Sequence, residues 1–368
     1  MPNEFTGRVA ILQHWLAPYR VPFFDRLASR CTGSLCIAAG HDFEGRPSHA
    51  NELRVAHFKQ LVNRRWLPGR FELITQQGVA DWLNGWKPDV LVATMNPRML
   101  SVPQACRWMR RHGGHVIGWG LGGMAVQPGL AMPLRRMLRR PLLRRFDRVI
   151  AYSSRAAQEY AAMGFPADRI SIAFNSTRHR PAAPPPSRSD VFEGWPRIAF
   201  VGQVSAPKRI DLLLKACAAM PPDRSPELLV IGDGPTRADA ERMAAQVHPR
   251  TRFLGDLRGE ALSAALNEVD LFVLPGMGGL AIQEAMAHAL PAIVAEGDGT
   301  QFDLIRPENG WHVRPNDLDH LVSTMREALT DPKRLRRMGE ASYRIVRDQI
   351  NVEAMVDTFI SVLRGLDR

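Results

Sequence analysis

Apolar and polar residues follow two rhythms along the chain of 368 residues. Short, nearly continuous apolar runs predict buried strands, and apolar residues at helical spacing between them predict amphipathic helices. In the N-terminal half, this pattern predicts strands at residues 8–15, 34–40, 88–94, 115–120, 147–153 and 168–176. Helices are expected from Val21, at 103–113 and at 153–164, where Ser153 or Ser154 is the N-cap and Gly164 ends the helix.

The C-terminal half repeats the alternation of strand and helix. It predicts strands at residues 197–202, 227–232, 252–255, 270–275 and 291–296, and two closing helices at 317–330 and 333–348. Strands that alternate with helices form parallel sheets with helices on both faces, and ligands bind beyond the carboxyl ends of such strands. The chain therefore predicts an α/β fold in which two Rossmann-like domains face a central cleft.

A proline-rich segment divides the two halves. Residues 177–196 contain five prolines and few core positions, which is typical of a connector. We therefore expect an N-terminal domain at 1–176, a linker at 177–196 and a C-terminal domain at 197–348. Residues 349–368 have the apolar spacing of a further helix, which we expect to return to the N-terminal domain.

Composition excludes several classes of protein. Hydrophobic residues make up 45% of the chain and charged residues 23%, which fits a large core and argues against disorder. No apolar run approaches the roughly 20 residues that span a bilayer, and we expect no secretory signal at the N-terminus. The cysteines form no zinc-binding spacing, so we expect buried thiols in a reducing cytoplasm: Cys31, Cys36, Cys106 and Cys217.

The net charge of +11 is unevenly distributed. Residues 1–190 carry 27 Lys/Arg and 12 Asp/Glu, a balance of +15, whereas residues 191–368 carry 21 and 25, a balance of −4. Positive charge is densest at residues 131–148, which contain seven arginines. Helical spacing puts arginines on one side and leucines on the other, with an interruption at Pro141; the arginines proposed to face the membrane are Arg135, Arg136, Arg139, Arg140, Arg144 and Arg145.

Such a helix fits anionic lipid head groups, and the alternative is an ordinary solvated surface helix. Nucleic acid is not expected as a partner, because the basic charge does not interleave with stacking aromatic residues or with a recognised motif.

Glycines lie between the strand at 270–275 and the helix that follows it. Gly276, Gly278 and Gly279 permit backbone conformations closed to other residues, and Leu280 opens the helix. Free amides and the positive end of a helix dipole suit a diphosphate. Glu284, one turn into the helix, is placed to accept hydrogen bonds from ribose hydroxyls. The alternative is a tight turn followed by an exposed glutamate.

Two other strand ends carry weaker signals. Lys208 and Arg209 stand just before a helix beginning near Ile210, where they would neutralise phosphate charge or simply be solvated. The stretch LVIGDGP at 229–235 runs from a strand into a turn.

The order and spacing of these blocks carry a resemblance. FVG…K, LLVIGDGP, RFLGDL, DLFVLP…EAMAHALP and NGWHVRPND occur between residues 200 and 317. This series resembles the C-terminal, donor-binding domain of retaining glycosyltransferases of the GT-B fold, the glycosyltransferase family 4 group. The N-terminal half resembles the family more loosely, through HWLAPYRVPFFDRLA at 14–28.

The resemblance implies roles for particular residues. Lys208 and Glu284 would be the catalytic residues, Lys208 at the diphosphate and Glu284 at the ribose, and the backbone near Leu254 would hold the base. The whole donor-binding set would be Gly202, Gln203, Lys208, Arg209, Gly232, Leu254, Gly255, Gly276, Gly278, Gly279, Leu280 and Glu284. The acceptor side would include Pro18, Tyr19, Arg20, Gly120, Leu121 and Gly122.

The implied reaction is sugar transfer with retention, without a metal or other cofactor. The donor would be a UDP- or GDP-linked sugar, and the acceptor a lipid-linked or polysaccharide-precursor glycan at the cytoplasmic face of the membrane. The enzyme would be cytoplasmic and peripherally bound to anionic lipid. The DLD stretch at 317–319 resembles a metal motif of other glycosyltransferases, but Asn316 or Asp317 is better interpreted as a helix N-cap.

The chain departs from the family at three positions. Gly276 stands where members usually carry the first of two glutamates, Gln203 where they carry an arginine, and Leu121 where related sequences often carry a histidine. Arg209 is a candidate substitute for the missing arginine. The alternative function is therefore a catalytically degenerate protein that acts as a nucleotide-binding or partner subunit.

Overall fold

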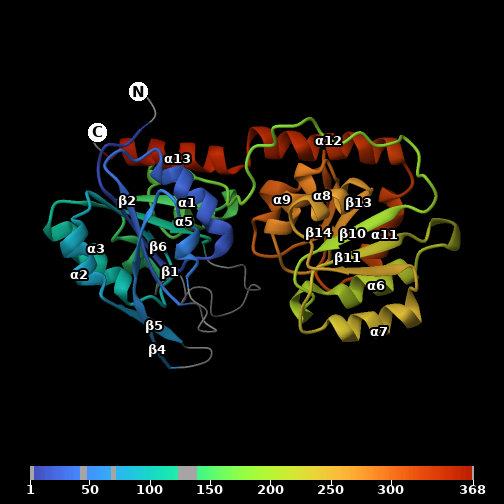
Figure 1. Ribbon diagram of the computed structural model, residues 1–368, viewed down its shortest axis with the longest axis horizontal. Helices are drawn as coiled ribbons and strands as arrows, with labels where there is room; N and C mark the ends of the chain where they lie inside the picture. Colours follow the sequence, from blue (N-terminus) through green and yellow to red (C-terminus); the bar gives the residue numbers. More distant parts are fainter. Residues whose placement is uncertain (1–3, 42–47, 68–71, 123–138, 367–368) are drawn as a thin grey trace. The chain divides into compact units, whose positions relative to one another are not determined.

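The computed structural model describes residues 4–41, 48–67, 72–122 and 139–366. The chain forms two compact units. The first consists of Met1–Thr177 and Val352–Arg368, and the second of Arg178–Asn351. Each unit is an α/β structure built on one parallel sheet (Figure 1).

The first unit contains a seven-stranded parallel sheet in the order β3-β2-β1-β6-β7-β8-β9. Its strands are β1 (Val9–Trp15), β2 (Leu35–Gly40), β3 (His57–Gln60), β6 (Val90–Thr94), β7 (His115–Gly120), β8 (Arg148–Ala151) and β9 (Ile170–Ile172). An antiparallel hairpin adds β4 (Val62–Trp66) and β5 (Leu73–Gln77). The helical elements are η1 (Pro18–Arg20), α1 (Val21–Ala28), η2 (Ala50–Glu52), α2 (Val79–Trp86), α3 (Ser101–Arg111), α5 (Ser154–Ala162) and η3 (Ala167–Arg169).

The second unit contains a six-stranded parallel sheet in the order β12-β11-β10-β13-β14-β15. Its strands are β10 (Arg197–Val201), β11 (Glu227–Ile231), β12 (Thr251–Gly255), β13 (Leu271–Leu274), β14 (Ala292–Ala295) and β15 (Gly310–Val313). The helical elements are η4 (Ala206–Lys208), α6 (Ile210–Ala218), η5 (Pro222–Arg224), α7 (Arg237–Val247), α8 (Gly259–Asn267), α9 (Leu280–Ala287), α10 (Gln301–Leu304), α11 (Leu318–Ala328) and α12 (Pro332–Asp348).

The prediction of an α/β fold with two parallel, Rossmann-like sheets is confirmed. Each predicted strand is present, with its ends shifted by a few residues. The pattern missed β3, the β4–β5 hairpin and β15. The strand β3 is an edge strand whose polar side chains are largely exposed, so it has no apolar run for a sequence pattern to detect.

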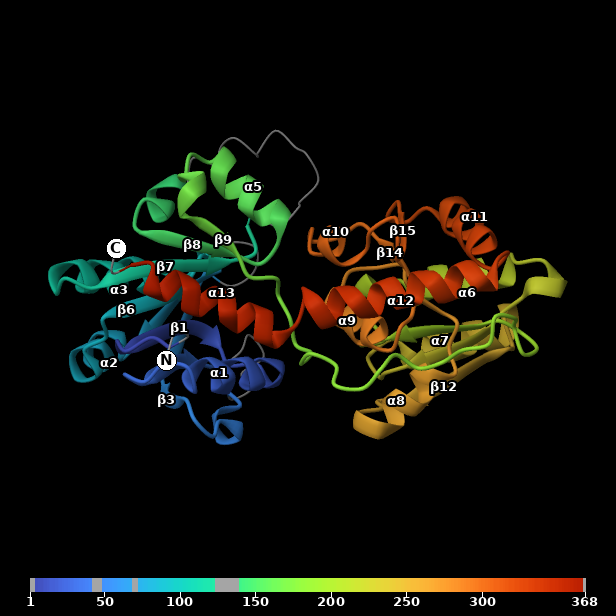
Figure 2. The same cartoon turned by 90° about the horizontal axis from the view of Figure 1, so that it is seen from above.

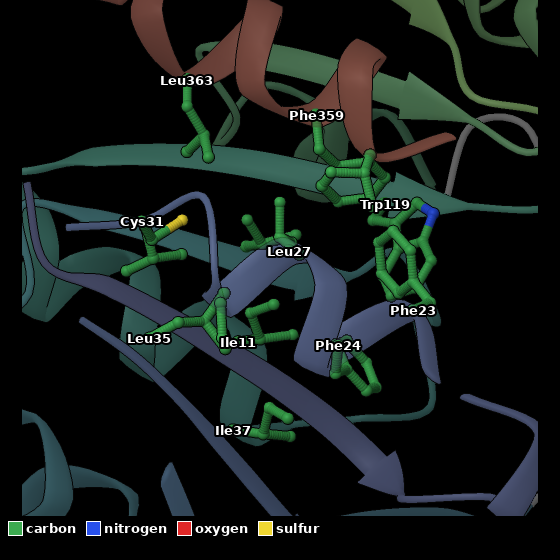
Figure 3. Close-up of a cluster of buried hydrophobic side chains, with 14 of the residues drawn as sticks. Ile11, Phe23, Phe24, Leu27, Cys31, Leu35, Ile37, Trp119, Phe359 and Leu363 are labelled. Carbon is green, nitrogen blue, oxygen red and sulfur yellow. The ribbon is translucent and has the colours of Figure 1, made fainter. Parts of the chain in front are cut away.

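The last helix, α13 (Val352–Arg364), belongs to the first unit and packs beside α1 (Figures 1 and 2). Its apolar face enters the first unit's core, where the ring of Phe359 lies 5.0 Å from that of Phe23 and 5.1 Å from that of Trp119 (Figure 3). Arg30 forms an ion pair of 2.9 Å with Asp357 on this helix. Burial of a large apolar side chain contributes about 1.5–3 kcal/mol, so several such residues hold α13 firmly.

The proline-rich segment lies along the second unit. Arg188 donates hydrogen bonds to the carbonyl oxygens of Leu266, Val269 and Ala289, at 3.0, 2.9 and 3.3 Å. Arg336 donates to the Ser189 carbonyl at 2.7 Å. Hydrogen bonds from one guanidinium to three backbone carbonyls leave no apolar pattern in the sequence. The composition of the segment therefore could not distinguish it from a free connector.

All four cysteines are buried and none forms a disulfide, so the prediction of buried thiols is confirmed. Burial raises the pKa of Cys31 to about 12 and that of Cys106 to about 11, which makes both thiols unreactive at neutral pH. Among the described residues, no helix combines the length and apolar character needed to span a bilayer.

Candidate functional site

Three neighbouring strands of the second unit end in glycines that touch one another. A Cβ atom at Gly232, after β11, would lie 2.0 Å from the carbonyl oxygen of Gly202, after β10. The Gly232 amide donates to the Gly255 carbonyl at 2.7 Å. Gly202 and Gly232 have φ angles of +142° and +135°, a region that favours glycine. The carboxyl edge of this sheet is therefore bare backbone, open to close approach by a ligand.

Gly276, after β13, is packed against the backbone of η4. A Cβ atom there would lie 2.3 Å from the Pro207 carbonyl oxygen and 2.6 Å from that of Lys208. The Met277 amide donates to the same Pro207 carbonyl at 2.9 Å. The position where related sequences carry glutamate therefore has no room for any side chain in this protein.

Lys208 lies over the loop that precedes α9. A Cβ atom at Gly278, whose φ is +156°, would lie 2.5 Å from the Lys208 Nζ atom. Burial lowers the pKa of the Lys208 ammonium, and the nearby Asp298 opposes this shift. Among the described residues, no carboxylate lies within the 4.0 Å of an ion pair with Lys208. A desolvated cation without such a partner is suited to an anionic ligand.

The loop after β14 holds the glycine loop in place. The fully buried Gln301 donates from Nε2 to the Gly278 carbonyl at 2.7 Å and accepts from the Gly299 amide at 3.1 Å. The Thr300 hydroxyl donates to Asp298 at 2.7 Å and would lie 2.8 Å from a Cβ atom at Gly279. The sequence interpretation missed these residues, although GDGT directly after a predicted strand is a recognisable turn signal.

Glu284 lies in α9 with 17% of its side chain exposed. Its Oε2 atom is 3.2 Å from Arg178 Nη1, and its Oε1 atom is 3.4 Å from His288 Nε2. His288 is oriented in turn by Asn267, at 3.0 Å from Nδ1. Arg178 was not predicted, since it lies in the proline-rich segment far from Glu284 in sequence.

Arg209 is committed to a different partner. Its Nε and Nη2 atoms donate to the two carboxylate oxygens of Asp211, at 2.9 and 3.0 Å. This pairing raises the pKa of Arg209 and lowers that of Asp211. Gln203 is exposed. Of the cations predicted to contact the diphosphate, Lys208 is the one directed at the glycine loop.

The residues predicted for the base lie at the end of β12. Gly255 has a φ of +73°, and its carbonyl accepts from Gly232 and, at 3.1 Å, from Leu257. Leu254, the preceding residue, is half-buried. Their assignment to the base stays a prediction.

The predicted acceptor residues lie at the carboxyl edge of the first unit's sheet. Pro18 and Tyr19 are exposed, whereas Arg20 is buried next to the ring of Trp119 in β7. At the end of β7, the Gly122 amide donates to the Tyr160 hydroxyl at 2.9 Å, and a Cβ atom at Gly120 would lie 2.6 Å from that hydroxyl. Leu121 is half-buried.

The basic segment is only partly described. Arg135 and Arg136 lie outside the described residues. Residues 139–143 are helical, Arg140 and Arg144 are exposed, and Arg139 and Arg145 are half-buried. The apolar residues that follow Pro141 belong to the core of the first unit: Leu142, Leu143, Phe146 and Val149. The leucine side of the predicted amphipathic helix is therefore covered by the core at Leu142 and Leu143, and these two side chains cannot insert into a membrane as such a helix would.

Asp317 is the N-cap of α11, and its carboxylate accepts from the His320 amide at 2.8 Å. This hydrogen bond and the Arg314 side chain lower the pKa of Asp317. The interpretation of Asp317 as a cap is confirmed. That the protein needs no metal stays a prediction.

Comparisons with known proteins agree with this geometry. Residues 187–345 match the family described as glycosyl transferases group 1, and residues 24–175 match the glycosyl transferase 4-like domain. The sulfoquinovosyl transferase of Arabidopsis thaliana is 32% identical over 155 residues, which are 40% of this chain and 29% of that enzyme. The chain therefore spans less than a third of that relative.

Two further comparisons extend over more of the chain. The GDP-mannose-dependent monoacylated alpha-(1-6)-phosphatidylinositol monomannoside mannosyltransferase of Corynebacterium glutamicum is 26% identical over 277 residues, which are 69% of each protein. The solved structure of Anabaena HepE in complex with UDP has a TM-score of 0.72 at 14% identity, and covers 97% of this chain and 100% of that one. The structural likeness shows the fold, which is the GT-B fold. The chain belongs to the group 1 glycosyltransferases, of the glycosyltransferase 4-like type.

Proposed function

We propose that this chain transfers a sugar, with retention of configuration, from a nucleotide diphosphate sugar to a glycan acceptor. One observation carries the proposal: the Lys208 ammonium lies over Gly278, in the loop that leads into α9. A half-buried cation, the free amides of a helix N-terminus and a floor of glycine backbone together suit a diphosphate.

The donor nucleotide is UDP or GDP. The corynebacterial relative is named as GDP-mannose-dependent, and the Anabaena structure contains UDP. Glu284, whose carboxylate is held between Arg178 and His288, accepts hydrogen bonds from the ribose hydroxyls. The backbone at Leu254 and Gly255 lies beside the base.

The chain's own residues account for the chemistry. Lys208 and the amides of Gly278, Gly279 and Leu280 stabilise the negative charge that develops on the leaving diphosphate as the glycosidic bond breaks. In other enzymes, one such preorganised donor contributes about 10²–10³ in rate. The acceptor hydroxyl gives its proton to the leaving phosphate, so that neither a metal nor a carboxylate at position 276 is required.

The acceptor is a lipid-linked or polysaccharide-precursor glycan at the cytoplasmic face of the membrane. The support is the +15 balance of residues 1–190 and the exposure of Arg140 and Arg144. An arginine near an anionic bilayer contributes about 1 kcal/mol. Since Leu142 and Leu143 are buried in the core, the attraction is electrostatic in the described part of the basic segment.

Liposome flotation tests the membrane proposal. We expect binding to vesicles that contain phosphatidylglycerol at low salt and release at high salt, because screening shortens the attraction to about 8 Å at physiological ionic strength. Replacing Arg139, Arg140, Arg144 and Arg145 by Gln should weaken flotation. Equal flotation with neutral and anionic vesicles would contradict an electrostatic contact.

The comparisons give no support to the degenerate alternative. The glycine at position 276 also has a structural reason, since a side chain there would collide with Pro207. Its presence is therefore not a sign that a catalytic side chain has simply been lost.

The test of activity is the release of UDP or GDP from a panel of nucleotide sugars incubated with the protein and a membrane extract. We expect release with at least one sugar, and loss of release in Lys208→Ala. Lys215→Ala is the matched control, because Lys215 is an exposed lysine on the adjoining helix α6. Release that survives Lys208→Ala, or that falls equally in both variants, would contradict the proposed site.

A further inference from the structure

Arg20 occupies an unusual position for a charged residue. It ends η1 and precedes α1, and only 8% of its surface is exposed. Its Cζ atom lies 4.9 Å from the ring centre of Trp119, 5.3 Å from that of Tyr152 and 5.5 Å from that of Tyr19. The guanidinium is thus enclosed by three aromatic rings at the carboxyl edge of the first unit's sheet.

The guanidinium has no acidic partner in the part of the chain that the structure describes. Among the described residues, no carboxylate lies within 4.0 Å of it, and its Nη1 atom is buried without a hydrogen-bond acceptor. The acid on α1, Asp25, instead accepts from the backbone amides of 54–56. Arg20 also faces the Tyr152 phenol, and its charge opposes the rise that burial causes in the pKa of Tyr152. Cation–π contacts contribute about 0.5–2 kcal/mol each, but they satisfy none of the remaining N–H groups.

A second donor without a partner among the described residues belongs to one of these three rings. The side chain of Trp119 is fully buried, and its Nε1 atom has no hydrogen-bond partner among the described residues. Figure 3 shows its ring against Phe23, with the indole nitrogen at the margin of the labelled side chains. Both the indole and the guanidinium can only donate, so the group that satisfies them must be an acceptor.

The second unit shows how this protein satisfies a half-buried arginine when its role is structural. Arg188 donates to three backbone carbonyls within 3.3 Å. Among the described residues, the Arg20 Nη1 and Trp119 Nε1 atoms have no such acceptors, and an unsatisfied buried donor is destabilising. Such a cost is tolerated where a ligand supplies the missing acceptor.

We propose that Arg20 and Trp119 bind a phosphate or diphosphate group of the acceptor. The inference rests on the proposed function, in which the first unit binds the acceptor. The planar fork of a guanidinium matches a phosphate with two parallel hydrogen bonds. The balance of +15 in residues 1–190 favours a multiply charged anion. The phosphate belongs either to a lipid-linked diphosphate or to a soluble phosphorylated glycan.

Calorimetry with two probes tests the binding. The probes are inorganic pyrophosphate and farnesyl diphosphate, titrated in phosphate-free buffer into a Lys208→Ala background, so that the nucleotide site does not take up the probe. We expect binding, and at least a tenfold loss on adding Arg20→Gln. Arg26→Gln is the matched control, because it removes the same charge from an exposed position on α1 and should leave binding unchanged.

A structural role for Arg20 predicts a different result. If Arg20 binds a ligand, saturating pyrophosphate should raise the thermal midpoint of the Lys208→Ala background and leave that of the same background with Arg20→Gln unchanged. Arg188→Gln should lower the midpoint. Should Arg20→Gln fail to fold, Trp119→Phe keeps the ring and removes the N–H, and should weaken pyrophosphate binding severalfold.

The relative affinities of the two probes distinguish a lipid-linked acceptor from a soluble one. Tighter binding of farnesyl diphosphate than of pyrophosphate supports a lipid-linked acceptor, and equal binding supports a soluble phosphorylated one. Absence of binding by both probes, or equal losses in Arg20→Gln and Arg26→Gln, would overturn the inference. Because UDP and GDP bind to the second unit, their retained affinity in Arg20→Gln shows that a failure here leaves the proposed function standing.

Discussion

The carboxyl edges of the two parallel sheets carry different kinds of hydrogen-bond donor. At the carboxyl edge of the second unit, glycines lie so close together that a Cβ atom at Gly232 would be 2.0 Å from a neighbouring carbonyl oxygen. The hydrogen-bond donors there are backbone amides, with one lysine. At the corresponding edge of the first unit, the donors are side chains, and Arg20 is enclosed by aromatic rings.

This difference separates two ways of preparing a site for an anion. The second unit excludes side chains and fixes its amides by hydrogen bonds such as that from Gln301 to Gly278. In our proposal, the first unit instead uses buried donors that have no acceptor among the described residues, at a cost that a ligand would relieve. A backbone site fails when a side chain is added, whereas a site of unsatisfied donors fails when one is removed.

The largest effect is expected from Gly276→Glu, which introduces the glutamate that related sequences carry. The new side chain collides with Pro207 and displaces η4 together with Lys208. A charged hydrogen bond contributes about 1.5–3 kcal/mol, so displacing Lys208 together with the glycine loop should weaken nucleotide binding by at least that amount. Calorimetry with UDP and GDP measures the loss.

The matched control for that substitution is Met277→Glu. Met277 is the next residue and is 54% exposed, so the same charge is added without a collision. Nucleotide affinity should change little in this variant. An increase in activity in Gly276→Glu would show that the position is a vacant catalytic site and not a packing contact.

The next effect is expected from Lys208→Ala, which should weaken UDP or GDP binding about 10- to 150-fold. The pH dependence sharpens the test. Because burial lowers the pKa of Lys208, its charge is lost at a lower pH than that of an ordinary lysine, and nucleotide affinity should decline as the pH rises through that region. Lys208→Arg should remove the slope. A flat profile in the wild type would place the diphosphate away from Lys208.

A smaller effect is expected from Arg178→Ala. The ion pair between Arg178 and Glu284 is partly exposed, so its contribution is at most about 1 kcal/mol, or about fivefold in nucleotide affinity. Glu284→Ala should cost more, because it removes the hydrogen bonds to ribose themselves. If Arg178→Ala weakens the binding of inorganic pyrophosphate as much as that of UDP, Arg178 does not act through Glu284.

The smallest effect concerns stability without ligand. The pKa of Lys208 is lower in the folded protein than its ordinary value of 10.5, so the charged lysine opposes folding at neutral pH. As the pH rises from the lowered pKa towards 10.5, the wild type should gain stability, because the unfolded chain then binds more protons than the folded one. Lys208→Met should not show this gain. Chemical denaturation across that pH range measures it, and parallel profiles for the two proteins would contradict the shift.

Local sequence predicted the parts of the fold and site that depend on neighbours in the chain. The strand, glycine loop and helix around Gly278 lie within one short stretch, and Asp317 caps the helix that it immediately precedes. Long-range contacts were not predictable in this way. The contact of Arg178 with Glu284 joins two elements that are distant in sequence, and neither residue has a local pattern that marks its partner.

The arginine-rich segment at residues 131–148 is a second case in which local sequence did not predict a long-range contact. Helical spacing correctly placed Leu142 and Leu143 away from Arg144 and Arg145. It did not reveal that the leucines are buried against the first unit's core, because periodicity shows that a face is apolar and not what covers it. Arg20 likewise carries no sign in sequence of the rings of Trp119, in β7, and Tyr152, directly after β8.

Hydrogen–deuterium exchange upon addition of UDP or GDP tests the central claim most directly. The account predicts slower exchange of the amides at residues 276–284, with no change at residues 17–24 in the first unit. Lys208→Ala should remove this protection at the same nucleotide concentration, while Lys215→Ala should retain it. Protection confined to residues 17–24, or its absence at 276–284 under saturating nucleotide, would contradict the assignment of the diphosphate to the glycine loop of the second unit.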